Sequence, residues 1–470
     1  MSPSSRPLKI AVVGAGISGL STAFALKSAG HQVAIFESGD RAGGPIASTE
    51  KEGYRLEEGP HTLLVRTRAV AALLDELGLT DRIVEANDAA SRRYVVKNGR
   101  PTALPSSPAE ALTTPLLSPA ARLRALFEPL VGRFDDPHID ETLAHFVTRR
   151  LGPEVLDYLV DPFVGGIWAG DPHHLSAKHA FPTLVEWEET AGSIVVGAIK
   201  KMLTSRGEEK TPRRLLSFDK GLGTLIEAFT DRLESELRVN TPIRKLRRDD
   251  NGWRVIYQLG KARRGETFDA VFLTIPVHAL PDLEWENATP PANSIEELST
   301  LPYAPCNLVH LGFLREDVQH PLDGLGVLIP RVENFHILGS LFISTMFPDR
   351  APEGHVQLAT FIGGTRQPQH TEADDQTLIE MACLDLGRLL GIDADPQFAS
   401  ITRYERAIPQ FEVGHDVYRD HMSDIEAHLP GIFLAGNYHD GISVPDLLEA
   451  GQHHASRLQD AINTNDFLRR

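Results

Sequence analysis

The sequence predicts an α/β protein whose parallel sheet is assembled from segments that lie far apart along the chain. Residues 10–13 form a short apolar run that ends at a glycine, as a buried parallel strand does. Good helix formers follow over 21–29, and a second apolar run covers 32–36. Near the other end of the chain, residues 431–437 again form a strand pattern that stops at glycine, before a helical pattern over 444–462. We therefore expect a Rossmann-like domain interleaved with other units.

The turn after the first strand has the glycine spacing of a dinucleotide-binding loop, reading Gly14-Ala15-Gly16-Ile17-Ser18-Gly19. Gly14 permits the tight turn, Gly16 lets the backbone approach a pyrophosphate, and Gly19 lets the helix pack on the strand. The helix N-terminus offers free N–H groups to the phosphates. Glu37 follows the second strand, near the roughly 20-residue spacing expected for a carboxylate on ribose hydroxyls. Alone, Glu37 would be equally well explained as a solvated acid, but its context favours the ligand role.

Two further motifs separate the possible dinucleotides. After Glu37-Ser38, the run Arg41-Ala42-Gly43-Gly44 puts a cation and two permissive glycines beside the expected pyrophosphate. An NAD dehydrogenase usually continues directly into its next βα unit, whereas this chain continues with Gly53-Tyr54-Arg55-Leu56-Glu57-Glu58-Gly59-Pro60-His61. This order of motifs resembles the flavin amine-oxidase superfamily. The resemblance implies FAD, and because no attachment motif is apparent we expect it to be bound non-covalently.

Length, charge and cysteine content exclude several classes of protein. The 470 residues suggest roughly three domains. A net charge of −17 argues against a nucleic-acid partner. Cys306 and Cys383 are too few for a disulfide framework or a metal cage, and we expect no metal site. The first residues lack the apolar core of a signal peptide, and no apolar run approaches the ~20 residues of a spanning helix, so we expect a cytoplasmic protein.

Residues 161–176 carry the most specific motif, which reads Asp-Pro-Phe-Val-Gly-Gly-Ile-Trp-Ala-Gly-Asp-Pro-His-His-Leu-Ser. Its glycines and the Asp171-Pro172 pair predict a loop between helices. This segment resembles the signature of protoporphyrinogen oxidases. Further matches to that family follow in order along nearly the whole chain, at 216–225, 326–330, 347–352, 360–364 and 407–415.

The resemblance implies three interleaved domains. It gives a Rossmann-like FAD-binding domain at 1–87, 219–275 and 403–470, a mixed-sheet substrate-binding domain at 88–98, 196–218 and 276–402, and a helical, membrane-docking domain at 99–195. It also implies that Ile243 lies against the adenine through its backbone. Near the flavin or its ribityl phosphate it places Gly436, Ile442, Ser443 and Val444.

The resemblance further implies a porphyrinogen substrate, a large apolar macrocycle with propionate tails. Such a ring needs apolar walls and an arginine that binds a carboxylate bidentately. By similarity Arg93 is that arginine, Leu328, Leu341 and Phe361 enclose the ring, and Trp168 lines a wall. Without the family context Arg93 would be interpreted as solvated, and the three apolar side chains as core.

The implied reaction is hydride transfer from a meso carbon to flavin N5, with dioxygen reoxidising the flavin to give hydrogen peroxide. No catalytic residue is assigned, because the cofactor performs the chemistry and the protein positions the ring. The matches at 347–352 and 360–364 favour oxidation of protoporphyrinogen IX to protoporphyrin IX in haem biosynthesis. The alternatives are a coproporphyrinogen III oxidase, an amine oxidase or desaturase, and a non-catalytic flavin- or tetrapyrrole-binding protein.

The resemblance also implies peripheral attachment to the cytoplasmic membrane through the helical domain. A homodimer is one candidate assembly, and the sequence itself does not determine the oligomeric state. The candidate docking face consists of Leu116, Leu117, Leu123, Leu126, Phe127, Leu130 and Val131. Such a stripe at helical spacing is also typical of an intramolecular core. The net negative charge gives no general attraction to anionic lipid, so we expect binding driven by apolar contact.

Overall fold

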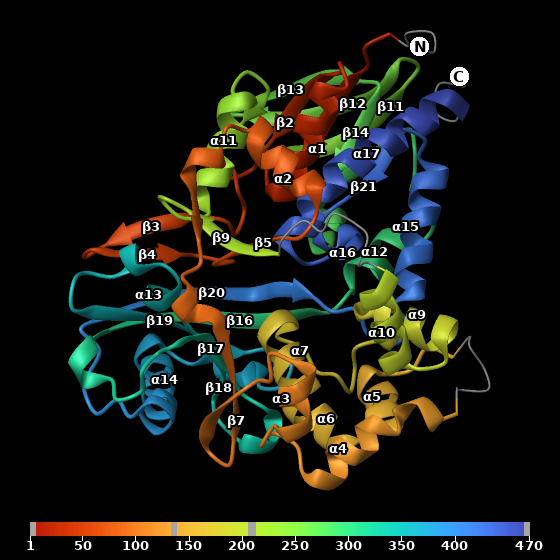
Figure 1. The fold of residues 1–470 in the computed structure, drawn as a ribbon. Coiled ribbons are helices and arrows are strands. Elements are labelled where there is room, and N and C mark those ends of the chain that lie inside the picture. The colour runs from red at the N-terminus through yellow and green to blue at the C-terminus, as the bar shows by residue number, and fades with distance from the viewer. Residues whose placement is uncertain (1–5, 133–138, 205–212, 465–470) are drawn as a thin grey trace.

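A parallel sheet assembled from three distant segments organises the upper part of the molecule in Figure 1. The computed structural model describes residues 6–132, 139–204 and 213–464. The strand order is β10-β2-β1-β14-β21, and every pair is parallel. The strands are β1 (Lys9–Val13), β2 (Gln32–Phe36), β10 (Leu237–Arg238), β14 (Ala270–Leu273) and β21 (Ile432–Leu434). The α/β class and the interleaved connections predicted from the sequence are therefore confirmed.

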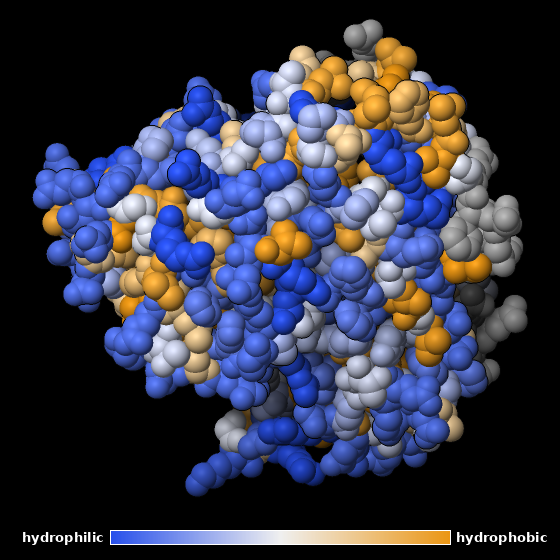
Figure 2. All heavy atoms as spheres, turned by 90° about the horizontal axis from the view of Figure 1, so that it is seen from below, coloured by the Kyte–Doolittle hydropathy of each residue, from blue (hydrophilic) through white to orange (hydrophobic). Residues whose placement is uncertain are grey.

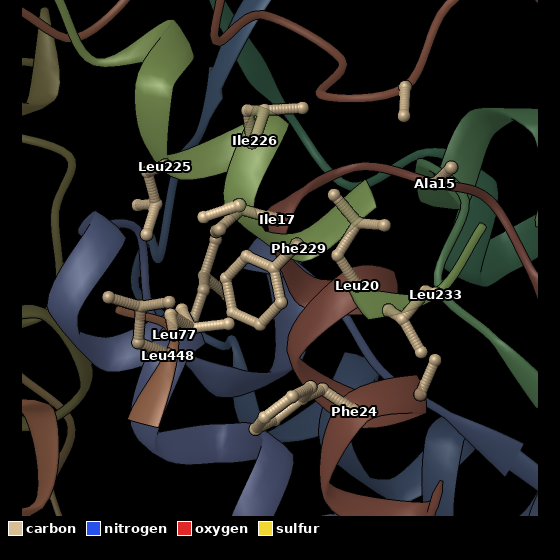
Figure 3. Close-up of a cluster of buried hydrophobic side chains, with 14 of the residues drawn as sticks. Ala15, Ile17, Leu20, Phe24, Leu77, Leu225, Ile226, Phe229, Leu233 and Leu448 are labelled. Atoms are coloured by element: carbon tan, nitrogen blue, oxygen red, sulfur yellow. The ribbon is translucent and has the colours of Figure 1, made fainter. Parts of the chain in front are cut away.

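Helices cover one face of this sheet and a second sheet covers the other. The helices are α1 (Ile17–Ser28), α2 (Arg68–Glu76), α11 (Gly223–Arg232) and α17 (Val444–Thr464). Figure 3 shows Ile17, Leu20 and Phe24 of α1 packed among apolar side chains of α11 and α17, and the ring centroids of Phe24 and Phe229 lie 5.7 Å apart. The opposite face carries β11 (Ile243–Asp249), β12 (Gly252–Leu259), β13 (Ala262–Phe268), β15 (Glu284–Glu286), α12 (Ser294–Ser299) and α15 (Asp416–His428).

A seven-stranded mixed sheet lies below, in the order β20-β16-β19-β18-β17-β7-β8. Its strands are β7 (Arg92–Lys97), β8 (Arg100–Ala103), β16 (Tyr303–Leu314), β17 (Gly324–Leu328), β18 (Ile337–Phe342), β19 (His355–Gly363) and β20 (Phe398–Pro409). One face packs on α14 (Asp375–Leu390), and the other faces the upper part of the molecule. Between the two large sheets lie the hairpin of β3 (Ser48–Lys51) and β4 (Tyr54–Glu57), a small sheet of β5 (Leu63–Val65), β9 (Arg214–Phe218) and β6 (Ile83–Glu85), and α13 (Ile343–Met346).

The remaining segment is helical, as predicted, and prolines divide it into short pieces. Pro108, Pro119, Pro153 and Pro182 each begin a helix, where the missing N–H costs nothing. The helices are α3 (Pro108–Thr113), α4 (Pro119–Leu126), α5 (Leu143–Leu151), α6 (Pro153–Val155), α7 (Asp161–Trp168), α8 (Ala177–Ala180), α9 (Pro182–Ala191) and α10 (Ile194–Thr204). Across the described residues, none of the helices combines the length and apolarity that crossing a membrane requires.

Two expectations for this segment are wrong. The first half of 161–176 is the helix α7 rather than a loop, because its glycines serve close packing instead of turns. Leu116 and Leu117 are buried, so they do not belong to an exposed face.

The strands cross the expected domain limits: β20 runs through residue 403, β8 extends the lower sheet beyond residue 98, and β9 pairs with β5 and β6. The segment 205–212, part of the expected substrate-binding domain, lies outside the described residues.

Candidate active site

The glycine-rich turn between β1 and α1 has the geometry of a phosphate cradle. Gly14 has φ +104°, and a Cβ there would lie 3.0 Å from Thr274 Oγ1. A Cβ at Gly19 would lie 2.0 Å from the Gly14 carbonyl oxygen, so this glycine is needed for α1 to approach the turn. At Gly16, by contrast, a Cβ would have no neighbour within 4 Å among the described residues. Gly14 and Gly19 therefore shape the turn, and Gly16 faces open space.

The N-terminus of α1 is suited to an anion. Within the described part of the chain, no side chain caps this helix end, and its first turn has no acidic residue. The Ser18 hydroxyl oxygen is buried and has no hydrogen-bond partner among the described groups. An orphaned donor beside unpaired N–H groups fits a bound phosphate, which would satisfy both. The residues present thus fit the phosphates of a dinucleotide.

Glu37 and the second glycine pair lie against this turn. The Glu37 carboxylate accepts hydrogen bonds from the Ala15 and Gly39 N–H groups, at 2.8 and 2.7 Å. The Gly43 N–H donates to the Ala15 carbonyl at 2.8 Å, so a second pass of backbone runs beside the loop. A Cβ at Gly44 would lie 3.6 Å from Gly16 Cα. The neighbouring Ser38 is exposed, as is Arg41, which donates to Glu58 at 3.3 Å.

The strand and helix near the C-terminus, at 431–462, lie at the same edge of the parallel sheet as the turn between β1 and α1. Ser21 Oγ of α1 donates to the Leu448 carbonyl of α17 at 2.8 Å, and each residue lies about one turn into its helix. The N-termini of both helices therefore point to the carboxyl edge of the parallel strands, where such sheets bind ligands. Gly436 follows β21, and the short helix α16 (Asn437–Asp440) leads from it to α17.

The other residues expected at the cofactor are those at 442–444 and Ile243. Ser443 and Val444 are at the start of α17, and Ile442 packs against the apolar cluster of the helical segment. Ile243 begins β11 and is half-buried beside the cluster that contains Phe36. Its preceding turn is tied to Glu37, because the Thr241 N–H donates to the Glu37 carbonyl at 2.7 Å.

Four of the expected substrate residues share one face of the lower sheet. Leu328 pairs with Val95, Leu341 with Gly326, and Phe361 with Gly339. Because side chains alternate along strands, Arg93, Leu328, Leu341 and Phe361 point to the same side, the side opposite the core on α14. Leu328, Leu341 and Phe361 are only partly buried. The Arg93 guanidinium is exposed and makes no ion pair or hydrogen bond within the described residues.

Residues 59–61, which end the motif at 53–61, lie against this face. Gly59 approaches the Pro45 carbonyl too closely for any side chain, and Pro60 follows it. The His61 ring lies 5.9 Å from that of Phe361 and 5.4 Å from that of His310. His61 is buried, which lowers its pKa well below the usual value, and within the described residues its Nε2 has no partner. His61 thus joins the nucleotide-side motif to the apolar face.

A buried cluster supports this junction. His310 Nε2 donates to the Glu57 carbonyl at 2.9 Å, and burial lowers the pKa of His310 to about 4. Burial raises the pKa of Glu57 to about 7, although Ser48 Oγ and the Leu222 N–H donate to its carboxyl at 2.6 and 2.9 Å. Glu57 therefore fastens the hairpin of β3 and β4 to the start of α11.

Helix α7, the first half of the motif at 161–176, covers one edge of the apolar face. Its packing shows why this motif contains glycines and an aspartate. A Cβ at Gly166 would lie 2.4 Å from Leu328 Cδ2, and one at Gly165 would lie 2.6 Å from the Arg366 guanidinium. Asp161 pairs with Arg366 at 3.1 Å, and its carboxylate accepts from the Arg331 N–H at 2.7 Å. The glycines and the carboxylate thus hold α7 against the end of β17. Arg331 and Arg366 carry no sequence signal for this role.

Trp168 does not join the other predicted substrate residues. Its side chain is buried in the core of the helical segment, with its ring 5.2 Å from Phe411 and 6.3 Å from Phe181. The exposed apolar side chains of α7 are instead Phe163 and Ile167, which sequence reasoning did not single out. Thr274 was also missed; it directly follows β14, and its hydroxyl donates to the Val13 and Gly14 carbonyls at the β1 turn.

Comparison with known proteins places this geometry in a family. A family model described as flavin containing amine oxidoreductase matches residues 17–459. A mitochondrial protoporphyrinogen oxidase of Nicotiana tabacum is 35% identical, with 94% of this chain and 93% of the relative covered. A coproporphyrinogen III oxidase of Staphylococcus aureus is 29% identical, with 96% and 98% covered.

Solved structures agree in fold. A crystal structure titled as a putative protoporphyrinogen oxidase from Exiguobacterium superposes with a TM-score of 0.78 at 25% identity, covering 97% of this chain and 99% of the other. A reduced UDP-galactopyranose mutase superposes with a TM-score of 0.73 at 17% identity, covering 96% of each chain, and shares the fold alone.

Proposed function

We propose that this chain, which belongs to the family of flavin containing amine oxidoreductases, oxidises protoporphyrinogen IX to protoporphyrin IX with FAD and dioxygen. The observation that carries the proposal is the apolar face of Leu328, Leu341 and Phe361 with the unpaired Arg93 at its edge. Such a face matches a large apolar ring with a propionate tail. The curated relatives named as porphyrinogen oxidases support the substrate class.

The proposed roles follow from the site. The turn at 14–19, with Glu37, Gly43 and Gly44, would hold the phosphates and ribose of non-covalent FAD, and Ile243 would lie by the adenine. Gly436 and residues 442–444 would border the flavin end. FAD supplies a hydride acceptor when bound. The chain's own residues orient the ring: Arg93 binds a propionate, Leu328, Leu341 and Phe361 exclude water, and α7 keeps Leu328 in place.

An oxygen-electrode assay of the purified yellow protein tests the proposal and ranks the substrates. We expect protoporphyrinogen IX to give oxygen uptake, hydrogen peroxide and porphyrin fluorescence faster than coproporphyrinogen III does. Faster turnover of coproporphyrinogen III would establish the alternative substrate, which the Staphylococcus aureus relative keeps open. Porphyrinogen binding without oxygen uptake would identify a carrier instead of an enzyme.

Arg93→Ala should lower kcat/KM while FAD stays bound. Loss of charge-assisted hydrogen bonds costs about 1.5–3 kcal/mol, which is roughly 10- to 150-fold in kcat/KM. Arg93→Lys should restore only part of this, because an ammonium group lacks the planar fork. Arg92→Ala is the matched control, since Arg92 is the adjacent exposed arginine and pairs with Asp323. If the Arg93→Ala and Arg92→Ala variants have equal kcat/KM, Arg93 is a solvated surface arginine that does not bind a propionate.

We also propose weak, reversible membrane attachment through the helical segment. Leu123, Leu126, Phe127 and Leu130 are 55%, 57%, 54% and 80% exposed, and Figure 2 shows apolar side chains gathered in patches on this side of the molecule. We expect salt-resistant flotation with liposomes that is lost in the Leu126→Asp/Phe127→Asp variant, with flavin content intact. Leu259→Asp, at an exposed leucine on β12, is the control. A protein that never floats with liposomes would contradict attachment and leave the oxidase proposal standing.

A further inference from the structure

A line of hydrogen bonds connects α1, α17 and the loop after β21. Thr22 Oγ1 of α1 lies 2.8 Å from His454 Nδ1 of α17, and His454 Nε2 lies 3.1 Å from Asp440 Oδ1. The other oxygen of Asp440 accepts from the Gly436 N–H at 2.7 Å. His454 is fully buried and the Asp440 side chain is only 4% exposed. Asp440 belongs to the 436–443 loop, which contains α16 and ends at the residues assigned above to the flavin end of the site, whereas Thr22 and His454 belong to α1 and α17.

The protons of this line can be counted. The Thr22 hydroxyl has one proton, and it donates to the Ser18 carbonyl at 2.7 Å, as threonine in a helix commonly does. Thr22 must then accept the bond from His454, so Nδ1 carries a proton. Nε2 faces a carboxylate oxygen, and that contact is favourable only with a second proton between them.

We infer that His454 is a buried imidazolium held between Thr22 and Asp440, and that this ion pair positions the 436–443 loop for the flavin. This inference rests on the proposed function, because it requires the flavin to bind at this edge of the sheet. A buried pair of this kind is costly to break, since the partner left behind is an uncompensated charge. The pair therefore fixes the loop to the two helices whose N-termini face the site.

The surrounding charges favour an ionised Asp440. His439 Nδ1 lies 2.6 Å from the same carboxylate oxygen as His454 Nε2, and these hydrogen bonds hold the pKa of Asp440 well below its usual range. From β14 the Phe272 ring lies 5.8 Å from that of His454, and from α1 the neutral Thr22 hydroxyl contacts it. The other charged or titratable neighbours are Tyr438 beside Asp440, His453 and Arg457 on α17, and Glu426 of α15, which pairs with Arg457.

A metal ion is the competing interpretation. Within the described residues, His439, Asp440 and His454 form the one group of potential ligands whose atoms lie within 4.8 Å of one another. However, His439 Nδ1 and Asp440 Oδ1 are 2.6 Å apart, which is hydrogen-bond distance. Two ligands of a tetrahedral zinc ion with bonds of about 2.0–2.1 Å would lie about 3.3 Å apart. The spacing therefore favours shared protons.

Nitrogen NMR of the holoenzyme labelled with ¹⁵N-histidine tests the charge directly. The signal of His454 is assigned by its loss in the His454→Gln variant. At neutral pH we expect both ring nitrogens to show the shift of protonated nitrogen. A neutral tautomer with one unprotonated nitrogen would overturn the inference, as would stoichiometric Zn²⁺ in the purified protein whose removal by a chelator changes this signal. The same measurement can be made on the apoprotein, because the inferred charge of His454 does not depend on bound flavin. Failure of this inference is therefore distinguishable from failure of the proposed function.

Release of FAD tests the positioning role. At a temperature well below unfolding, His454→Gln and Asp440→Asn should each release FAD at least about tenfold faster, because a buried pair loses one partner. The double variant should release FAD no faster than the faster single variant. His453→Gln, at the exposed neighbour on the same helix, should match the wild type. Variants that lower the melting temperature but release FAD at the wild-type rate would show that the pair stabilises the fold without positioning the loop.

Discussion

Gly16→Val is expected to fold as the apoprotein and to bind little or no FAD. The backbone of Gly16, at φ −68° and ψ 175°, is open to any L-residue, and an added Cβ meets no described atom within 4 Å. The protein itself therefore tolerates the side chain. The added methyl groups occupy the space between the turn and a bound pyrophosphate, which the glycine leaves free. The ratio of flavin to protein absorbance measures FAD loading, and calorimetry measures apoprotein stability.

Gly19→Val is the matched comparison, because it alters the same motif through a different mechanism. A Cβ at Gly19 would lie 2.0 Å from the Gly14 carbonyl oxygen, so the helix and turn must separate. We expect this variant to lose apoprotein stability as well as FAD. Full flavin absorbance in Gly16→Val would show that the turn does not hold the cofactor. A large loss of apoprotein stability in Gly16→Val would show that Gly16 serves packing.

The sequence predicts the parts of the fold that are encoded locally. The β1–α1–β2 unit follows from an apolar run, a glycine turn and a helical pattern, and the observed β2 has the predicted limits. Helix α1 begins at Ile17, one turn before the expected helical run at 21–29. The C-terminal strand and helix are recognised in the same way. By contrast, β7 pairs in parallel with β17, far along the chain, and no local pattern encodes that partner. Only family resemblance brought Arg93 and Leu328 together before the structure did.

The errors have a common physical cause. Gly165 and Gly166 were interpreted as turn residues, but in α7 they are small surfaces against Arg366 and Leu328, and a sequence does not distinguish these uses. Likewise, an apolar stripe indicates that one face is buried without showing what covers it. Leu117 packs inside the molecule, whereas Leu126 on the same stripe is exposed. The tie between Asp161 and Arg366 also depends on tertiary packing alone.

The largest stability loss is expected from Arg150→Met in the helical segment. Arg150 of α5 is fully buried, forms an ion pair with Glu128, and donates to the Val131 and Gly192 carbonyls at 2.9 and 2.8 Å. Glu128 in turn accepts hydrogen bonds at the start of α10, from the Ile194 N–H at 3.1 Å among others. This one guanidinium therefore joins α5 to the segment at 128–132 and to the turn before α10.

Methionine can fill the space of the arginine stem but leaves the Glu128 carboxylate without its buried cation. Such a loss costs about 3–5 kcal/mol, whereas an exposed pair contributes about 0–1 kcal/mol. Lys178→Ala is the control, because Lys178 and Asp416 are 55% and 50% exposed. Urea unfolding followed by tryptophan fluorescence should show a large shift for Arg150→Met and almost none for Lys178→Ala. Changing Glu128 to Met as well should recover part of the loss, because the buried carboxylate left without a cation is then removed. Glu188, which also pairs with Arg150 at 3.3 Å, keeps Arg149 as its partner. If Arg150→Met costs no more than the control, water or neighbouring groups must already neutralise Glu128, and the ion pair does not hold the helical segment together.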